Sequence, residues 1–287
     1  MFLKDKSFPN TVRVQKLLVS DSLRNVNSNI QFETQPFNVP VSTNAYLVGS
    51  PASEVMAARM FGYKPETGFE GHHIFTGLAE YPFRWVMDHN IVQCEATHHL
   101  QRHHDGTATY HKIDADTPKL PNWGIELDEQ TRKHLSTNGK VPKRLYPVET
   151  NFLIEGERKK LLSTDYLLIT RIPNVFSRDA VDQNKFVVSI AGTHGMGTIA
   201  FEKVINDQRA RMMIGEALHK ENILQSVRNK EHVGFQVLLE VKLDYRNTVP
   251  IFKEVRIYGE KPVLFGGNWD WFSMAKSVEK RTLEENM

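Results

Sequence analysis

The chain is almost free of cysteine. It holds one, Cys94, among 287 residues, so no disulfide can form within the chain. Stabilising disulfides belong to oxidising compartments, and a single thiol is typical of a reducing one. A buried structural thiol fits the surrounding stretch NIVQCEATHH better than a nucleophile does. The cysteine count therefore predicts a cytoplasmic protein whose core needs no cross-links.

Long hydrophobic runs and an excess of one charge are missing as well. No segment approaches the roughly 18–20 apolar residues that a membrane-spanning helix needs, and MFLKDKSFPN at the start lacks the apolar region of a signal peptide. The 36 basic and 34 acidic residues nearly cancel, which leaves no strong overall positive field for nucleic acid. We expect neither a membrane nor a nucleic acid as partner, while an oligomer stays open.

The patterns that are present alternate between strands and helices. Apolar runs predict strands, helical spacing predicts helices, and two stretches of alternating polarity predict an antiparallel hairpin. The strands are expected at 45–48, 164–174 and 185–191, the helices at 54–60, from 199 onward and at 209–226, and the hairpin at 235–245 and 251–259. We predict one α/β domain over residues 1–287, with a Rossmann-like mixed sheet flanked by helices and a C-terminal β-hairpin.

The segment 66–150 does not follow this alternation. It is rich in aromatic and turn-forming residues, and eight of the twelve histidines lie between His72 and His111. We predict a His-rich insertion, with strands near 84–95 and 107–113, that forms either a lid over a site or an excursion of the scaffold.

The stretch GTHGMGT, which ends the apolar run KFVVSIA, is the first candidate site. A helix that starts after such a strand has about four unpaired N–H groups and partial positive charge at its N-terminus. Glycines let the backbone approach an anion closely, and threonine hydroxyls add donors. The pattern predicts a phosphate or carboxylate cradle made of Gly192, Thr193, Gly195, Gly197 and Thr198. The alternative is a tight turn whose glycines serve packing alone.

The stretch VGSPASE offers a second loop of this kind, through Gly49, Ser50 and Ser53. Taken alone, this stretch favours a capped helix entry in which Pro51 fixes the turn. If the strands 45–48 and 185–191 are neighbours in a parallel sheet, the two loops face one crevice. We expect Arg171 and Asn174 near the same edge, where Arg171 would clamp an anion or form a surface salt bridge.

Two residues beside these loops suit acid–base chemistry. Glu54 follows the first loop, and His194 lies within the second. Either could exchange a proton with a bound ligand. An acidic residue in the first turn of a helix also simply matches the helix dipole, so Glu54 has that second explanation.

Two groups of residues have a spacing that could suit a metal ion. His99 and His103 are four residues apart and would share one helical face, with Asp105 or a distant residue as third ligand. Asp114 and Asp116 form a D-x-D spacing that could hold a divalent cation on a nucleotide sugar. No H-E-x-x-H motif occurs, and the strand before Asp114 is only weakly apolar. We therefore assign no metal site.

Several stretches resemble a family of prokaryotic Rossmann-like domains of the kind seen in S-layer-like C-terminal region proteins. The matching stretches are AYLVGSPASEVMAARMF, DYLLITRIPNVF and VVSIAGTHGMGTIAFEKVI, followed by a β-rich tail, and they cover about 44–63 and 164–258. The chain departs from the pattern in Gly49-Ser50, where the family has two glycines, and in Val175, where it has proline. AYLVGSPASE also looks like the opening of nucleoside deoxyribosyltransferases. The resemblance implies the fold and the two loops and gives no catalytic residue.

Together these features predict a protein that binds a nucleotide-type, phosphate-bearing small ligand, and that cleaves or transfers at it if it is an enzyme. A non-catalytic sensor or interaction module is the first alternative. A metal-dependent transferase using Asp114 and Asp116 is the second. No cofactor can be assigned.

Overall fold

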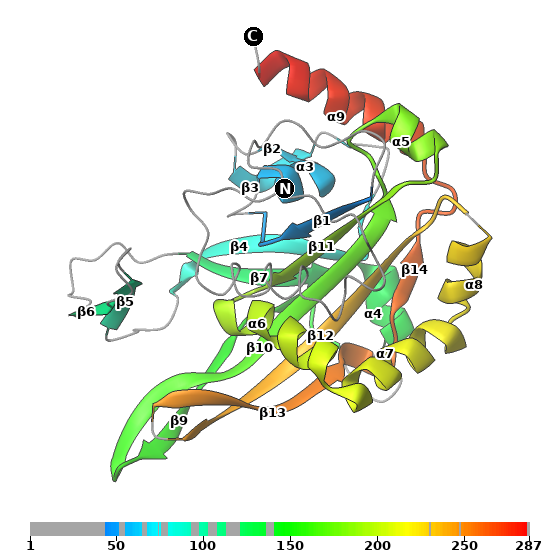
Figure 1. The fold of residues 1–287 in the computed structure, drawn as a ribbon. Coiled ribbons are helices and arrows are strands. Elements are labelled where there is room, and N and C mark those ends of the chain that lie inside the picture. Colours follow the sequence, from blue (N-terminus) through cyan, green and yellow to red (C-terminus); the bar gives the residue numbers. More distant parts are fainter. Residues whose placement is uncertain are drawn as a thin grey trace.

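A mixed seven-stranded sheet is the main element of the computed structural model. The structure describes residues 44–51, 55–64, 68–73, 75, 80–92, 98–102, 108–112, 121–135, 141–229, 231–246 and 248–285. The strands of the sheet are β1 Ala45–Val48, β9 Val148–Ile154, β10 Glu157–Pro173, β11 Phe186–Gly192, β12 Gly234–Arg246, β13 Val249–Ile257 and β14 Val263–Phe265. Their order is β1-β11-β10-β12-β13, with β9 beside β10 and β14 beside β12 (Figure 1).

Strand direction is what distinguishes this sheet from a doubly wound one. Among its described pairs only β1 and β11 run parallel, with Val48 opposite Ile190. β10 is antiparallel to β11 and to β12, and β12 forms an antiparallel hairpin with β13. The expected mixed sheet and C-terminal hairpin are thus confirmed.

Helices cover one face of the sheet. They are α6 Gly195–Asn206, α7 Gln208–Lys220 and α8 Ile223–Arg228, and α6 and α7 lie in front of the strands in Figure 1. Ala200 and Val204 of α6 pack in one apolar cluster with Val48, Leu167 and Ile190 of the sheet. This cluster holds the helical layer against the strands.

The opposite face packs against a more varied layer. It contains α3 Val55–Met60, β4 Phe83–Val92, β7 Pro121–Leu127, α4 Glu129–Leu135, β8 Arg144–Leu145, α5 Arg178–Asp182 and α9 Trp271–Glu285. Leu168 belongs to the apolar cluster on this side, whereas its neighbour Leu167 belongs to the helical side. Strands buried on both faces carry unbroken apolar runs, which explains DYLLITRI. Full burial of one such leucine contributes roughly 1.5–3 kcal/mol relative to exposure.

Part of the His-rich segment belongs to the main core. Phe83 and Trp85 of β4 and Ile125 and Leu127 of β7 are buried in the same cluster as α3. The Gln236 side chain of β12 bonds both the N–H and the C=O of Phe83, each at 2.9 Å. The smaller elements are β2 Tyr63–Lys64, β3 Gly68–His73, β5 His98–Arg102, β6 Ala108–Lys112 and the 3-10 helix η2 Tyr258–Glu260. The strands expected near 84–95 and 107–113 correspond to β4 and β6; the lid stays a prediction.

Two of the three predicted helices are confirmed. α3 and α6 lie where they were expected, whereas α4, α5 and α9 were not predicted. The single helix predicted over 209–226 is wrong, because Asn222 takes a left-handed conformation (φ 57°, ψ 13°) and divides it into α7 and α8. Asparagine adopts that conformation more readily than other non-glycine residues. No helix in the part of the chain that the structure describes is long and apolar enough to cross a membrane.

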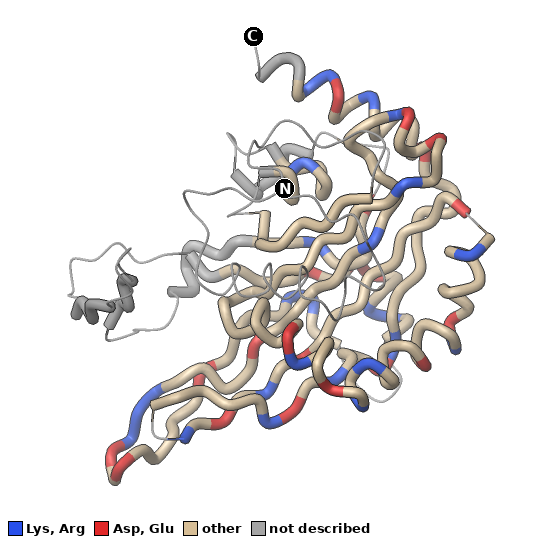
Figure 2. Tube along the Cα trace, viewed as in Figure 1, with Lys and Arg blue, Asp and Glu red and all other residues tan. Residues whose placement is uncertain are grey.

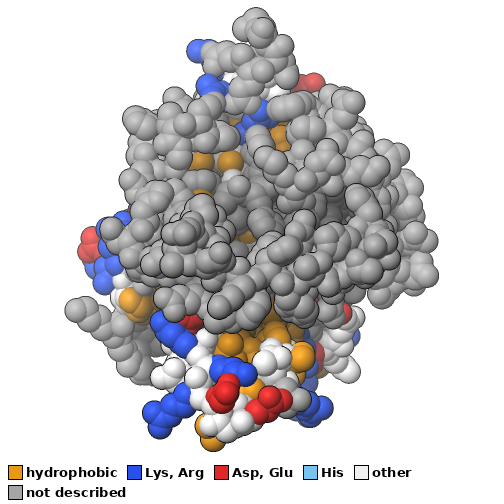
Figure 3. All heavy atoms as spheres, turned by 90° about the vertical axis from the view of Figure 1, so that its left-hand side faces the viewer, with side chains coloured by type: hydrophobic (Ala, Val, Ile, Leu, Met, Phe, Trp, Pro, Cys, Tyr) orange, Lys and Arg blue, Asp and Glu red, His pale blue; other side chains and the backbone are white. Residues whose placement is uncertain are grey.

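The hairpins β9–β10 and β12–β13 extend beyond the helices as an arm, at the lower left of Figure 1. Pairing of β10 with β12 ends at Thr164 and Lys242, where both strands also have irregular register. The arm and the helices carry most of the charged residues, whereas the central strands carry few (Figure 2). Figure 3 shows hydrophobic side chains among charged ones at the bottom of the molecule. Exposed apolar residues of the arm include Leu153, Val249 and Ile251.

Candidate functional site

The two predicted loops leave the same end of the sheet. β1 and β11 are parallel neighbours, and the Gly49 N–H donates to the Ile190 carbonyl at 3.1 Å. Gly49 has φ 132°, a backbone conformation that favours glycine. Ser50 follows it, half-buried, beside the exit of β11. The expectation that strands 45–48 and 185–191 lie side by side is therefore confirmed.

An internal carboxylate occupies the predicted anion cradle. Asp165 of β10 is fully buried, and its Oδ1 accepts from the Thr193 hydroxyl at 2.6 Å and from the His194 N–H at 3.0 Å. Its Oδ2 accepts from the Gly197 N–H. Donors at a helix N-terminus favour a negative group, and here the protein supplies one. The main-chain N–H donors of an anion site are present at the start of α6, but those of His194 and Gly197 donate to Asp165.

Antiparallel pairing explains how Asp165 reaches the loop. Leu167 of β10 lies opposite Gly192, the last residue of β11, so Asp165 comes level with the residues that follow. The Thr193 N–H donates to the Tyr166 carbonyl at 2.9 Å, which continues the strand pairing into the loop. A carboxylate 28 residues away in sequence thereby becomes the partner of the α6 N-terminus.

The glycines of the loop are required by close packing. A Cβ on Gly197 would overlap the Tyr166 carbonyl oxygen, and one on Gly192 would overlap the Thr198 nitrogen. The Thr198 hydroxyl accepts from the Gly192 N–H at 2.9 Å and is buried. Gly195 is the first residue of α6. Gly192, Gly197 and Thr198 thus build the turn itself, as the packing alternative anticipated.

His194 is the member of this loop that reaches solvent. Its side chain is 38% exposed, and its Nδ1 lies 4.0 Å from Asp165 Oδ2. That nitrogen is buried and makes no hydrogen bond with the described residues. As the N-cap of α6, His194 makes no side-chain cap either. The imidazole therefore turns its Nδ1 to a buried carboxylate and leaves its outer part accessible, an arrangement suited to proton transfer.

Arg171 and Asn174 do not lie at this end of the sheet, so the expectation that they do is wrong. Because β10 is antiparallel to β11, Arg171 faces Val188, and the chain reaches the start of β11 before Asn174. At about 3.3 Å per residue, Arg171 is roughly 13 Å along the strand from Leu167. Arg171 stacks over Phe186 at 4.6 Å, and burial lowers its pKa. Asn174 is buried and accepts from the Phe176 N–H, as a turn residue does.

Other predicted residues fall elsewhere. Ser53, Glu54, His103, Asp105, Asp114 and Asp116 lie outside the described residues. His99 belongs to strand β5, so the helical face proposed for a His99–His103 metal pair is wrong. Among the residues that the structure describes, no three His, Cys, Asp or Glu side chains gather as a metal site would require.

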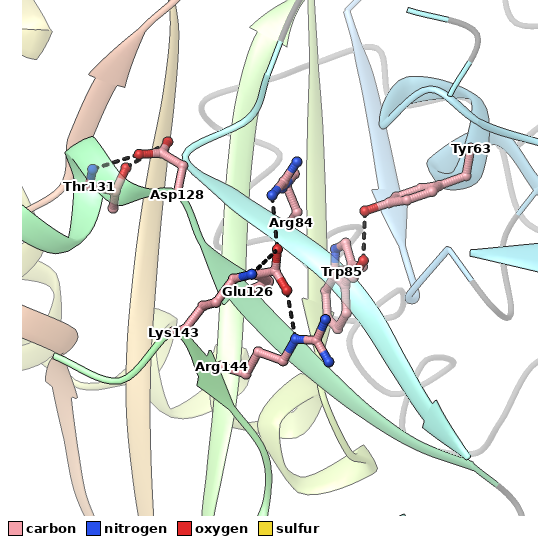
Figure 4. Close-up of polar contacts among 8 residues, drawn as sticks. All are labelled: Tyr63, Arg84, Trp85, Glu126, Asp128, Thr131, Lys143 and Arg144. Atoms are coloured by element: carbon pink, nitrogen blue, oxygen red, sulfur yellow. Dashed lines mark hydrogen bonds and ion pairs between the residues drawn. The ribbon is translucent and has the colours of Figure 1, made fainter. Parts of the chain in front are cut away.

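Sequence reasoning missed a second buried carboxylate, Glu126 of β7. It accepts from Arg84 of β4 at 2.9 Å and from Arg144 of β8 at 2.6 Å, and Lys143 lies 3.8 Å away (Figure 4). Burial alone would raise the pKa of Glu126, but the hydrogen bond from Arg144 and the three positive charges lower it overall. The three strands place these side chains in one row, which no local pattern reveals.

No family model, curated protein or solved structure matches the chain.

Proposed function

We propose that the protein binds a small polar ligand where β1 and β11 end, and that His194 is the acid–base group of a reaction on that ligand. The observation that carries the proposal is the pair formed by Asp165 and His194, with a buried Nδ1 4.0 Å from a fully buried carboxylate.

The chemistry follows the division of roles in other carboxylate–imidazole pairs. A carboxylate that faces Nδ1 fixes the tautomer and the orientation of the ring, which leaves Nε2 to take up or release a proton. Asp165 is a positioning residue here, because it is buried and cannot touch the ligand. Ser50, at the end of the adjacent strand, is the side chain we assign to orienting the ligand.

The nucleotide-type ligand expected from the loops is a narrower form of this proposal. The N–H groups of His194 and Gly197 already donate to Asp165, so a phosphate would depend on Ser50, on the His194 side chain and on the α6 dipole. The Rossmann-like part of the proposal rests on the parallel strands β1 and β11 and on α6, which follows β11. If ligand binds without turnover, the sensor alternative replaces the enzyme.

A thermal-shift screen with nucleotides, sugar nucleotides and nicotinamide dinucleotides tests ligand binding. A ligand at 100 times its Kd should add about 2.7 kcal/mol to the free energy of unfolding. His194→Gln should diminish the shift, whereas His219→Gln, a change of an exposed histidine on α7, should leave it unchanged. If none of these compounds shifts the melting temperature, the nucleotide form of the proposal fails.

Turnover of any compound that binds then separates enzyme from sensor. His194→Gln should lower kcat by about 10²–10⁴-fold, the usual contribution of a general acid or base. Wild-type kcat in His194→Gln would remove His194 from the chemistry. Ser50→Ala should raise KM more than it lowers kcat, and the reverse result would contradict an orienting role.

A further inference from the structure

A cavity of about 490 Å³ lies at the opposite end of the sheet from His194. It opens between the segment before β12 and the segment that leads into α9. Its walls include Glu231, His232, Trp269, Asp270, Trp271 and Phe272. Phe235 of β12 lies opposite Arg171, whereas the His194 loop follows Gly192, opposite Leu167, so the two places are separate.

The aromatic walls of the cavity are fixed in place. The indole N–H of Trp271 donates to the His232 carbonyl at 2.6 Å and to the Gly266 carbonyl at 2.9 Å, which ties the two segments together. Trp269 packs against Trp271 with ring centroids 5.0 Å apart and against Phe265 at 4.9 Å. A ligand would therefore meet a preformed wall and cause little ordering on binding.

Two further rings border the opening. His232 and Phe272 meet edge to face with centroids 5.9 Å apart, and Phe272 is 43% exposed. Exposed aromatic faces attract cations through the ring quadrupole, most strongly for tryptophan. Indole, imidazole and phenyl rings therefore all line this cavity.

The charged carboxylate side chains that the structure describes in the wall of the cavity are Glu231 and Asp270. Asp270 accepts from the Ser273 N–H at 2.9 Å and from the Ser273 hydroxyl at 2.7 Å, and these bonds lower its pKa. Glu231 accepts a long bond from Asn229, at 3.3 Å. Within the described ranges neither carboxylate is paired with a lysine or an arginine.

We propose that this cavity binds a small organic cation with a quaternary or methylated ammonium group. The ammonium would lie against Trp269 and Phe272, with Glu231 and Asp270 supplying charge complementarity. Aromatic rings combined with carboxylates suit such a group better than a bare metal ion, which needs more oxygen or nitrogen ligands than the wall offers. This site is independent of the function proposed for His194.

Titration of tryptophan fluorescence with tetramethylammonium and with choline tests the proposal. Choline should bind saturably, and its uncharged carbon isostere 3,3-dimethyl-1-butanol should bind at least about 10-fold more weakly. Equal affinity for the two compounds, or no saturation by either cation, would overturn the proposal. Saturation only by a trimethyl-lysine peptide would also overturn it, in favour of a protein partner.

Variants locate the binding site. Phe272→Leu should weaken choline binding about 10-fold, and it is expected to fold because Phe272 is largely exposed. Glu231→Gln should weaken binding about 3-fold, whereas the control Glu221→Gln, outside the cavity, should not change it. Unaltered binding in both Phe272→Leu and Glu231→Gln would place the cation elsewhere. His194→Gln should leave choline binding intact, so failure here and failure at His194 can be told apart.

Discussion

Asp165 and Glu126 are two buried carboxylates whose hydrogen-bond donors differ in charge. Asp165 is surrounded by neutral donors, namely a hydroxyl and the N–H groups that begin a helix. Glu126 is surrounded by cations, whose own side chains are partly exposed. The first carboxylate fixes a loop in a deep position, and the second joins three strands near the surface.

This difference predicts which of the two carboxylates the protein can lose at the smaller cost in stability. If Asp165 is removed, its donors stay buried without acceptors, which costs the full desolvation of each. If Glu126 is removed, Arg84, Lys143 and Arg144 can turn to water, because each already reaches it. We therefore expect the loop to be the more sensitive region, and the following predictions run from the largest effect to the smallest.

Asp165→Ala should lower the free energy of unfolding by about 3–5 kcal/mol, because the Thr193 hydroxyl and the N–H groups of Tyr166, His194 and Gly197 lose an acceptor. Urea denaturation followed by circular dichroism measures this change. Asp244→Ala is the matched control, since Asp244 also accepts from the N–H of the next residue, at 2.8 Å, but is exposed. A loss for Asp165→Ala no larger than that of the control would contradict the assigned role.

Gly197→Ala should lower the free energy of unfolding by about 1–3 kcal/mol, because the new methyl group overlaps the Tyr166 carbonyl. Gly215→Ala, inside α7, meets nothing within 4 Å and should raise stability by about 0.5–1 kcal/mol. The two substitutions are compared by thermal unfolding. A gain in stability in both variants would show that the loop tolerates a side chain.

Glu126→Gln should lower the free energy of unfolding by about 1–2 kcal/mol, less than the change at Asp165, because the freed cations regain water. Glu129→Gln is the control, since Glu129 pairs with Lys133 at the surface. High salt should reduce the effect of Glu126→Gln, as ionic partners are screened, and should leave that of Asp165→Ala nearly unchanged. Equal salt dependence in both variants would contradict the assignment of ionic partners to Glu126 and neutral donors to Asp165.

The smallest expected effect is a pH dependence at Glu126. Its folded pKa lies below the ordinary value of 4.5, so its contribution to stability is present above that pH and is lost as the pH falls through the folded pKa. The difference in stability between the wild-type protein and Glu126→Gln should therefore shrink below about pH 4.5. Acid titrations of both proteins, followed by circular dichroism, measure this difference in stability. A difference that grows on acidification would contradict the prediction.

Local features of the sequence predicted much of the architecture. The strand, glycine loop and helix around Gly192 and the hairpin at the C-terminus appear as expected, because apolar spacing and turn residues act over a few neighbours. The donors predicted at the loop are present, but they bond Asp165 of the protein itself, and the ligand cradle stays a prediction. What the pattern could not say was that Asp165 would provide it, although an aspartate directly before the apolar run YLLI was visible.

The sequence by itself determined where β1, β11, α6 and the C-terminal hairpin lie along the chain, since apolar spacing and turn residues act over near neighbours. Only the tertiary structure decided that β10 runs antiparallel to β11. An apolar strand has the same pattern in either direction, so no local signal fixes its orientation. Because β10 runs antiparallel to β11, the end of β10 that holds Asp165 lies beside the loop. Arg171 and Asn174 lie toward the other end.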